Sequence, residues 1–304
     1  MLGEHAQRLR GLLTASGQII APGVYDALSA ALVMEGGFKA AYLSGASIAY
    51  TKLGRPDIGL VSAAEVGDTI AHIRERTDIP LIVDADTGFG NALNVQRTVR
   101  TFERMGASAI QIEDQLMPKR CGHLTGKSLI AGDEMVGKIK AALDARTDEN
   151  TVIIARTDAI AVEGFDAAID RAEAYVAAGC DVLFVEAPGS LDQMQKISRQ
   201  FSGRVPLLAN MVEGGATPIV SSETLNELGF RIVIYPGAIV RAVVWTTQRL
   251  LASLRENGTT AEYRDRMLDV AGLNEVVETE AILAAGERYD ANIAPATVSR
   301  DGQP

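Results

Sequence analysis

Short runs of apolar residues recur along the chain and alternate with longer stretches of helical periodicity. The apolar runs predict strands at 19–22, 40–44, 80–86, 109–114, 152–158, 182–186, 206–210 and 231–236. Between them, amphipathic stretches such as 95–105, 165–178 and 221–228 predict helices. Strands that alternate with helices favour a parallel sheet, and eight such units in roughly 230 residues favour a closed (β/α)8 barrel of the TIM type over an open sheet.

The pattern changes after residue 237, where helical periodicity continues through 241–257 and again over 262–285. We expect a single barrel domain over 1–290 that includes these C-terminal helices at about 240–290. A polar, disordered tail is expected over 291–304. One barrel does not need the additional helices to close, so contact with another subunit is a reasonable use for them.

Composition narrows the class of protein. Hydrophobic residues make up 47% of the 304 residues and aromatic residues only 5%, so aliphatic side chains fill the core, as in buried parallel strands. The 29 basic and 39 acidic residues give a net charge of −10 without a basic tract, which disfavours a nucleic-acid partner. Neither a membrane-spanning apolar stretch nor a signal-peptide pattern is present, and Cys121 and Cys180 are too few for a disulfide framework. We therefore expect a cytoplasmic enzyme.

Most of the predicted strands end in, or run directly into, a polar or reactive side chain. These residues are Ser44, Asp84 with Asp86, Glu113 with Asp114, Arg156 with Asp158, Glu186, Asn210 and Tyr235. In a barrel such strand ends converge on the face where active sites lie. Each residue alone is equally compatible with a helix cap or a turn. Their shared position favours a site.

Asp84 and Asp86 lie two residues apart on a predicted strand, so both carboxylates point to one face. Two negative charges so close repel each other unless one is protonated or a cation lies between them. Glu113 and Asp114 end the next strand and add further oxygens. Clustered carboxylates without a neighbouring histidine favour Mg²⁺ or Mn²⁺ over Zn²⁺. The alternative is a capping aspartate beside a turn over 86–90.

The loop after the fourth predicted strand reads Lys119-Arg120-Cys121-Gly122-His123. Basic neighbours lower the pKa of a thiol and attract anions. Gly122 and Gly126 allow the loop to bend and close over a substrate. The alternative is a solvated basic loop with an incidental cysteine. Cys180 enters a predicted strand, which is typical of an unreactive core cysteine.

These segments together resemble the isocitrate lyase/phosphoenolpyruvate mutase superfamily. The resemblance rests on residues 42–45, 84–90, 113–115 and 119–123, and it continues through 155–159, 185–187, 210–218 and 235–236. It covers roughly residues 15–250. Within the superfamily the chain looks most like the methylisocitrate lyase and 2,3-dimethylmalate lyase branch, for which the Lys-Arg-Cys-Gly-His loop is specific.

The resemblance implies a set of site residues. Mg²⁺, or Mn²⁺ in its place, is expected at Asp84, Asp86 and Glu113. The expected catalytic residues are Cys121, Lys119, Arg120, His123 and Tyr42. The expected substrate-binding residues are Ser44, Gly45, Ala46, Asp57, Gly122, Arg156, Glu186 and Asn210. The resemblance also implies that the last helix of the barrel swaps onto a neighbouring subunit, usually in a tetramer.

The implied reaction cleaves a carbon–carbon bond in a substituted 2-hydroxy di- or tricarboxylate of the 2-methylisocitrate or 2,3-dimethylmalate type. Its products are a 2-oxo acid such as pyruvate and a saturated carboxylate, succinate or propionate. The metal lowers the pKa of the substrate hydroxyl, and Lys119, Arg120 and His123 stabilise charge on the expelled fragment. Cys121 then protonates the carbanion as a general acid, and Tyr42 is a candidate base.

Two departures bear on specificity. Residues 267–274 lack the arginine that methylisocitrate lyases carry in this helical region, which favours a dicarboxylate substrate. Pro236 favours a lyase over the oxaloacetate hydrolases of the superfamily, in which serine is typical. Hydrolysis or decarboxylation of oxaloacetate at the same site is the alternative function. A barrel that binds a carboxylate without turning it over is a more remote one.

Overall fold

The computed structural model describes residues 3–122 and 124–289. Eight parallel strands close into a barrel in sequence order, and the last strand pairs with the first. The strands are β1 (Ile19–Val24), β2 (Ala41–Leu43), β3 (Leu81–Asp84), β4 (Ala109–Glu113), β5 (Val152–Thr157), β6 (Val182–Val185), β7 (Leu207–Asn210) and β8 (Phe230–Tyr235). The predicted TIM-type barrel is confirmed.

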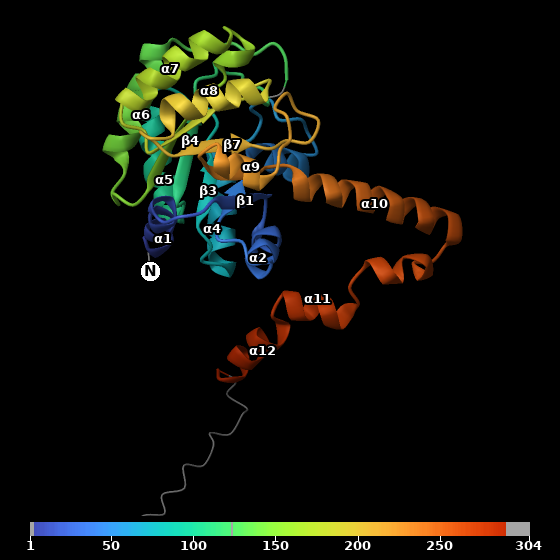
Figure 1. Cartoon of the computed structure of the whole chain (residues 1–304). Helices are drawn as coiled ribbons and strands as arrows, with labels where there is room; N and C mark the ends of the chain where they lie inside the picture. Colours follow the sequence, from blue (N-terminus) through green and yellow to red (C-terminus); the bar gives the residue numbers. More distant parts are fainter. Residues whose placement is uncertain (1–2, 123, 290–304) are drawn as a thin grey trace, which may run out of the picture. The chain divides into compact units, whose positions relative to one another are not determined.

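One helix precedes β1, and further helices connect successive strands around the barrel (Figure 1). They are α1 (Glu4–Thr14), α2 (Ala27–Glu35), α3 (Gly45–Ile48), α4 (Ala63–Arg76), α5 (Ala92–Met105), α6 (Gly132–Ala145), α7 (Phe165–Ala177), α8 (Leu191–Phe201) and α9 (Ser222–Glu227). Local sequence determines where several of them begin. Ser62 and Asn91, for example, form capping boxes with the residues three positions later, which satisfies backbone groups at the starts of α4 and α5.

Alternation along the strands divides the apolar core into two layers. One layer fills the inside of the barrel and includes Ile82, Ile154, Phe184 and Leu208, and the other layer packs between strands and helices. The next inward position on each of these four strands is polar: Asp84, Arg156, Glu186 and Asn210. The apolar interior therefore ends in a ring of polar side chains at the carboxyl ends of the strands, the face on which TIM-barrel active sites lie.

Two segments near this ring differ from the sequence predictions. The predicted strand 80–86 ends at Asp84, and Asp86 follows it in the left-handed region with a φ of 47°. The prediction that both aspartates share one strand is therefore wrong. After β2, the chain forms α3 and then a π-helical turn at Ala49–Leu53. This short segment has no apolar periodicity by which the sequence could have revealed it.

The chain divides into two compact units, Met1–Val244 and Trp245–Pro304. Helix α10 (Ala238–Asn257) crosses the division. The second unit continues with a 3-10 helix at Ala261–Arg266, α11 (Val270–Val276) and α12 (Thr279–Glu287), so turns interrupt the helical stretch predicted over 262–285. The single domain over 1–290 stays a prediction, and residues 291–304 lie outside the described residues.

Apolar side chains of the second unit are largely exposed within this chain. Trp245 is 55% exposed, Val270 80% and Ile282 66%. Surfaces of this kind are typical of contacts with another protein chain. Over the part of the chain that the structure describes, no helix combines the length and apolar character needed to cross a membrane.

Candidate active site

A pocket opens at the carboxyl ends of the strands. Its lining residues are Tyr42, Ser44, Ala46, Tyr50, Asp57, Asp84, Cys121, Gly122, Arg156, Glu186, Asn210, Val212, Pro236, Gly237 and Arg241. The set contains most of the residues predicted to bind substrate, together with the loop thiol and one of the predicted metal ligands. Because several strands and loops contribute, the pocket forms only when the barrel closes.

The carboxylates of Asp84 and Asp86 face a common point at the start of α3. A Cβ atom built on Gly45 would lie 3.3 Å from Oδ2 of Asp84 and 3.4 Å from Oδ1 of Asp86. The other Asp84 oxygen accepts hydrogen bonds from the Asp86 amide at 3.1 Å and from Nε2 of Gln111 at 3.3 Å. The absence of a side chain at Gly45 therefore leaves room in front of both carboxylates.

Too little positive charge lies beside these acidic residues to keep all of them ionised. Burial raises the pKa of Asp86 to about 7, although Lys119 opposes the shift with its ammonium 2.7 Å from Oδ1. Burial also raises the pKa of Glu113 well above its ordinary value, against the influence of Arg156. A cation between these groups would favour their ionised forms.

The donor set suits a hard divalent cation. Oε1 of Glu113 is buried and has no hydrogen-bond partner among the described residues. Considering residues 3–122 and 124–289, however, no three acidic, histidine or cysteine side chains are close enough to surround an ion on their own. Mg²⁺ usually keeps several waters and takes only one or two carboxylates directly. The arrangement is compatible with that mode of binding.

A network of cations lies beside the acidic residues. The Lys119 ammonium also contacts the carboxylate of Asp57, and both side chains are buried. The Arg156 guanidinium lies 3.1 Å from Glu113, 2.9 Å from Asp158 and 3.5 Å from Glu186. These contacts fix the orientation of Arg156 at the pocket wall, where its charge can act on a bound anion.

The loop that carries Cys121 lies against this network. The Cys121 amide donates to the Asp57 carbonyl at 3.1 Å, and the side chain is partly exposed to the pocket. A Cβ atom on Gly122 would lie 2.5 Å from Nη2 of Arg156, so only glycine permits this approach. Arg120 does not line the pocket, because its guanidinium donates to the Thr125 carbonyl of the same loop. His123 lies outside the described residues.

With this geometry established, known proteins identify the family. A family model described as phosphoenolpyruvate phosphomutase matches residues 9–255. The chain belongs to this family. The 2,3-dimethylmalate lyase of Eubacterium barkeri is 41% identical over 93% of this chain and 98% of its own length. The 2-methylisocitrate lyase of Aeropyrum pernix is 47% identical over 85% of this chain and 82% of its own. Both relatives are carbon–carbon lyases, so the predicted resemblance is confirmed.

Solved structures of the phosphoenolpyruvate phosphomutase family share the fold. A crystal structure of 2,3-dimethylmalate lyase matches with a TM-score of 0.87 and 35% identity over 99% of each chain. Oxaloacetate acetylhydrolase with 3,3-difluorooxalacetate matches with a TM-score of 0.89 and 33% identity over 95% of this chain and 98% of its own. Phosphonopyruvate hydrolase, solved with oxalate and Mg²⁺, matches with a TM-score of 0.85 and 32% identity over 94% of this chain and 99% of its own. Because one family fold supports these different reactions, the pocket residues must distinguish them.

Tyr42 occupies the pocket wall, but its phenol is already engaged. Its hydroxyl donates to Oε1 of Gln111 at 3.0 Å, and Gln111 donates in turn to Asp84. Burial, and then the charge of Asp84, raises the pKa of Tyr42 well above its ordinary value. A base must give up this proton easily, so the geometry disfavours that role. The base assignment stays a prediction.

Sequence reasoning missed four pocket residues, namely Tyr50, Val212, Gly237 and Arg241. Arg241 lies on the first turn of α10, and its guanidinium pairs with Glu213 at 2.5 Å. It follows the end of β8 by a few residues, so the rule that active sites form at strand ends would have found it. Tyr50 lies in the π-helical turn, for which the sequence shows no signal.

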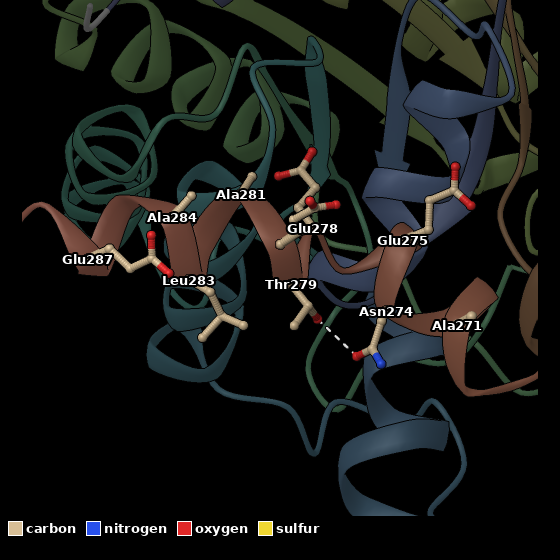
Figure 2. A pocket seen from close by; sticks show the side chains of 10 residues that line it. Ala271, Asn274, Glu275, Glu278, Thr279, Ala281, Leu283, Ala284 and Glu287 are labelled. Carbon is tan, nitrogen blue, oxygen red and sulfur yellow. Dashed lines mark hydrogen bonds between the residues drawn. The ribbon is translucent and has the colours of Figure 1, made fainter.

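A larger hollow of about 970 Å³, compared with about 60 Å³ for the barrel pocket, lies within the second unit. Figure 2 shows glutamates and alanines of α11 and α12 around it, with the Thr279 hydroxyl bonded to Asn274 at 2.9 Å. Its lining includes no cation, histidine or cysteine. Size alone does not identify a reactive site, and the reactive groups gather in the smaller pocket.

Proposed function

We propose that this chain is a magnesium-dependent lyase that cleaves a carbon–carbon bond in a substituted 2-hydroxy di- or tricarboxylate. The substrate class is that of 2-methylisocitrate or 2,3-dimethylmalate, and the products are a 2-oxo acid such as pyruvate and a saturated carboxylate. The observation that carries the proposal is the position of the Cys121 thiol. It lines the same pocket as Asp84, and the buried carboxylate of Asp86 faces the same space as that of Asp84.

Asp84, Asp86 and Glu113 would hold Mg²⁺, partly through water, and Mn²⁺ would suit the same oxygen ligands. When bound, the ion would supply positive charge that lowers the pKa of the substrate hydroxyl. The separation of Asp84 and Asp86 around the space in front of Gly45 supports this assignment. So does the phosphonopyruvate hydrolase of this family, which was solved with Mg²⁺ and oxalate.

The remaining groups bind and protonate the substrate. Arg156, oriented by three carboxylates, would attract a substrate carboxylate, and the backbone around Ser44 and Ala46 would receive another. The substrate hydroxyl would lose its proton to solvent water, its O–H electrons would form the C=O bond of the 2-oxo acid, and the electrons of the broken carbon–carbon bond would remain on the departing carbon. Cys121 would donate its proton there, so that a C–H bond forms and the sulfur keeps the S–H electrons as a thiolate.

Replacement of Cys121 by serine tests the acid role. We expect Cys121→Ser to lower kcat by about 10³-fold, because a serine hydroxyl is a much weaker acid. Binding of Mg²⁺ and of oxalate, measured by calorimetry, should stay unchanged, since neither requires the thiol. Cys180→Ser is the matched control, because Cys180 is a buried core residue, and its kcat should equal that of the parent. A Cys121→Ser enzyme with parental kcat would remove the proposed acid.

Oxaloacetate hydrolysis or decarboxylation is the second candidate function. The close match to oxaloacetate acetylhydrolase favours it, whereas the lyase relatives and Pro236 in the pocket favour carbon–carbon cleavage of the first class. Products should be identified with 2-methylisocitrate, 2,3-dimethylmalate, isocitrate and oxaloacetate, each with Mg²⁺. Release of a 2-oxo acid from the first two compounds supports the lyase, and turnover of oxaloacetate alone would overturn it.

We further propose a cytoplasmic homotetramer. The exposed apolar side chains of the second unit, among them Trp245 and Ile282, are suited to contact with another copy of this chain. Light scattering with the concentrated protein tests the assembly. A monomer at all concentrations would contradict it.

A further inference from the structure

The 119–127 loop is connected to the barrel by a buried lysine that the proposed reaction does not use. Lys127 has a side chain only 1% exposed, and its ammonium lies 2.9 Å from Oδ1 of Asp158, which is fully buried. The same ammonium donates a hydrogen bond to the carbonyl of Gly122, the residue after the Cys121 thiol. One buried cation therefore joins the reactive part of the loop to the end of β5.

The barrel side of this connection is rigid. The Asp158 amide donates to Asp114 at 2.9 Å, and the hydroxyls of Thr157 and Tyr175 each donate to the other Asp114 oxygen at 2.8 Å. Nη2 of Arg156 also donates a hydrogen bond to Oδ1 of Asp158 at 3.0 Å. Because every member of the network is buried and bonded, Asp158 has little freedom to move.

On the loop side, the residues before Gly122 are attached through Asp57 and Gln115: the Cys121 amide donates to the Asp57 carbonyl at 3.1 Å, and the Gln115 side chain bonds the backbone N–H and C=O of Arg120. At the base of the loop, Gln115 and Leu129 form an antiparallel bridge, and the Leu116 amide donates to the Ser128 carbonyl at 2.8 Å. Gly122 lies against Arg156 and Glu186 without a side chain of its own. The hydrogen bond from Lys127 to the Gly122 carbonyl therefore adds a buried attachment directly after Cys121, where the loop meets the pocket wall.

We infer that Lys127 is a positioning residue, which holds the Gly122 carbonyl against Asp158 and thereby sets the position of the Cys121 thiol in the pocket. The inference rests on the proposed function for the role of the thiol, but the contacts themselves do not depend on it. The simpler alternative is that Lys127 only neutralises the buried charge of Asp158. Two measurements separate these roles.

The first measurement is the alkylation of Cys121 by iodoacetamide, followed peptide by peptide by mass spectrometry and without substrate. In Lys127→Met, Cys121 should react at least about tenfold faster, the effect of losing one charge-assisted hydrogen bond. Cys180 is buried and burial raises its pKa to about 12, so its slow reaction reports global unfolding in the same sample. Faster reaction of Cys121 with unchanged Cys180 supports the positioning role, and an unchanged Cys121 rate overturns it.

The second measurement is the kinetics of a charge-matched double variant. Lys127→Met should lower kcat about 100-fold with KM changed less than about threefold, because a misplaced acid costs the chemical step. In Lys127→Met/Asp158→Asn both charges are absent, so a lysine that only balances charge would leave the double variant with the kcat of Asp158→Asn alone, and that result overturns the inference. We expect the kcat of the double variant to stay low, below that of Asp158→Asn alone. Lys127→Arg should recover part of the parental kcat, and the exposed control Lys196→Met should have the kcat of the parent.

Failure of the two proposals can be distinguished. If no substrate is cleaved by the parent protein, the proposed function fails, while the alkylation rates still decide whether Lys127 holds the loop. If the parent is an active lyase and Lys127→Met alters neither kcat nor the Cys121 rate, the positioning role fails alone.

Discussion

Two groups of buried carboxylates lie at neighbouring strand ends, and they differ in the positive charge beside them. We call Asp84, Asp86 and Glu113 the acidic cluster. We call Asp158 and Glu186, with their cations Arg156 and Lys127, the paired cluster. In the acidic cluster, burial raises the pKa of Asp86 to about 7. In the paired cluster burial acts in the same direction, yet Arg156 and then Lys127 hold the pKa of Asp158 below its ordinary value.

The carboxylates of both clusters are buried, so burial alone cannot account for the opposite pKa shifts. The difference is the ratio of cations to anions. Asp158 faces Arg156 and Lys127, whereas Asp86 shares the single ammonium of Lys119 with Asp57 and faces the charge of Asp84. Buried carboxylates that have too few cations beside them lower the stability of the fold. Such a deficit of positive charge in a pocket indicates a site at which a bound cation balances the charge.

The largest expected effect separates the clusters by function. Asp86→Asn should lower kcat by about 10³-fold through loss of charge at the metal site. Its melting temperature should not fall, because the change removes a poorly compensated buried charge and Lys119 keeps Asp57 as a partner. The matched change Asp158→Asn should instead lower the melting temperature, since Arg156 and Lys127 lose a shared anion. Equal destabilisation by both variants would show that the clusters do not differ as described.

A second prediction concerns the stability supplied by the paired cluster. Arg156→Met leaves three buried carboxylates without their guanidinium and should cost about 3–5 kcal/mol of unfolding free energy. Urea denaturation measures this loss. The control Arg204→Met removes an exposed ion pair with Glu173 and should leave the unfolding free energy nearly unchanged. A similar small cost for Arg156→Met would mean that the three contacts contribute little to stability.

The acidic cluster could be found from the sequence because period-two alternation applies along every strand. Ile82 and Ile154 point into the barrel, so Asp84 and Arg156 must follow them on the same side at the strand ends. That reasoning needs only local order and the rule that these ends meet. It failed for Asp86, where a left-handed turn, rather than the strand, brings the carboxylate beside Asp84.

In the paired cluster, the strand-end rule identified Arg156, Asp158 and Glu186 but not the cation Lys127. Lys127 and Asp158 are 31 residues apart, and no periodic pattern connects a loop lysine with the end of the next strand. The same holds for the Tyr42–Gln111 hydrogen bond, which changes the expected role of that tyrosine. Contacts of this kind depend on how a loop folds back, and composition and spacing do not determine that.

The smallest predicted effect is a pH dependence that should have opposite signs in the two clusters. The pKa of Asp86 is raised to about 7 from an ordinary value of 3.8, so the metal-free fold binds this proton more tightly than the unfolded chain. Its contribution to stability is therefore present below about pH 4 and is lost as the pH rises to about 7. The lowered pKa of Asp158 acts in the other direction, and its contribution is lost as the pH falls.

The pH dependence of Mg²⁺ binding isolates the contribution of the acidic cluster. Below pH 7 the ion must displace the Asp86 proton, so its affinity should fall by about tenfold per pH unit and level off above pH 7. Calorimetry between pH 5.5 and 8.5, in two buffers of different ionisation enthalpy, measures both the affinity and the released proton. In Asp86→Asn the part of the proton release that comes from Asp86 should disappear, which leaves any proton displaced from Glu113, and the remaining weak affinity should vary less with pH. An affinity independent of pH in the parent protein would mean that Asp86 is already ionised without the metal, and the contrast between the clusters would not hold.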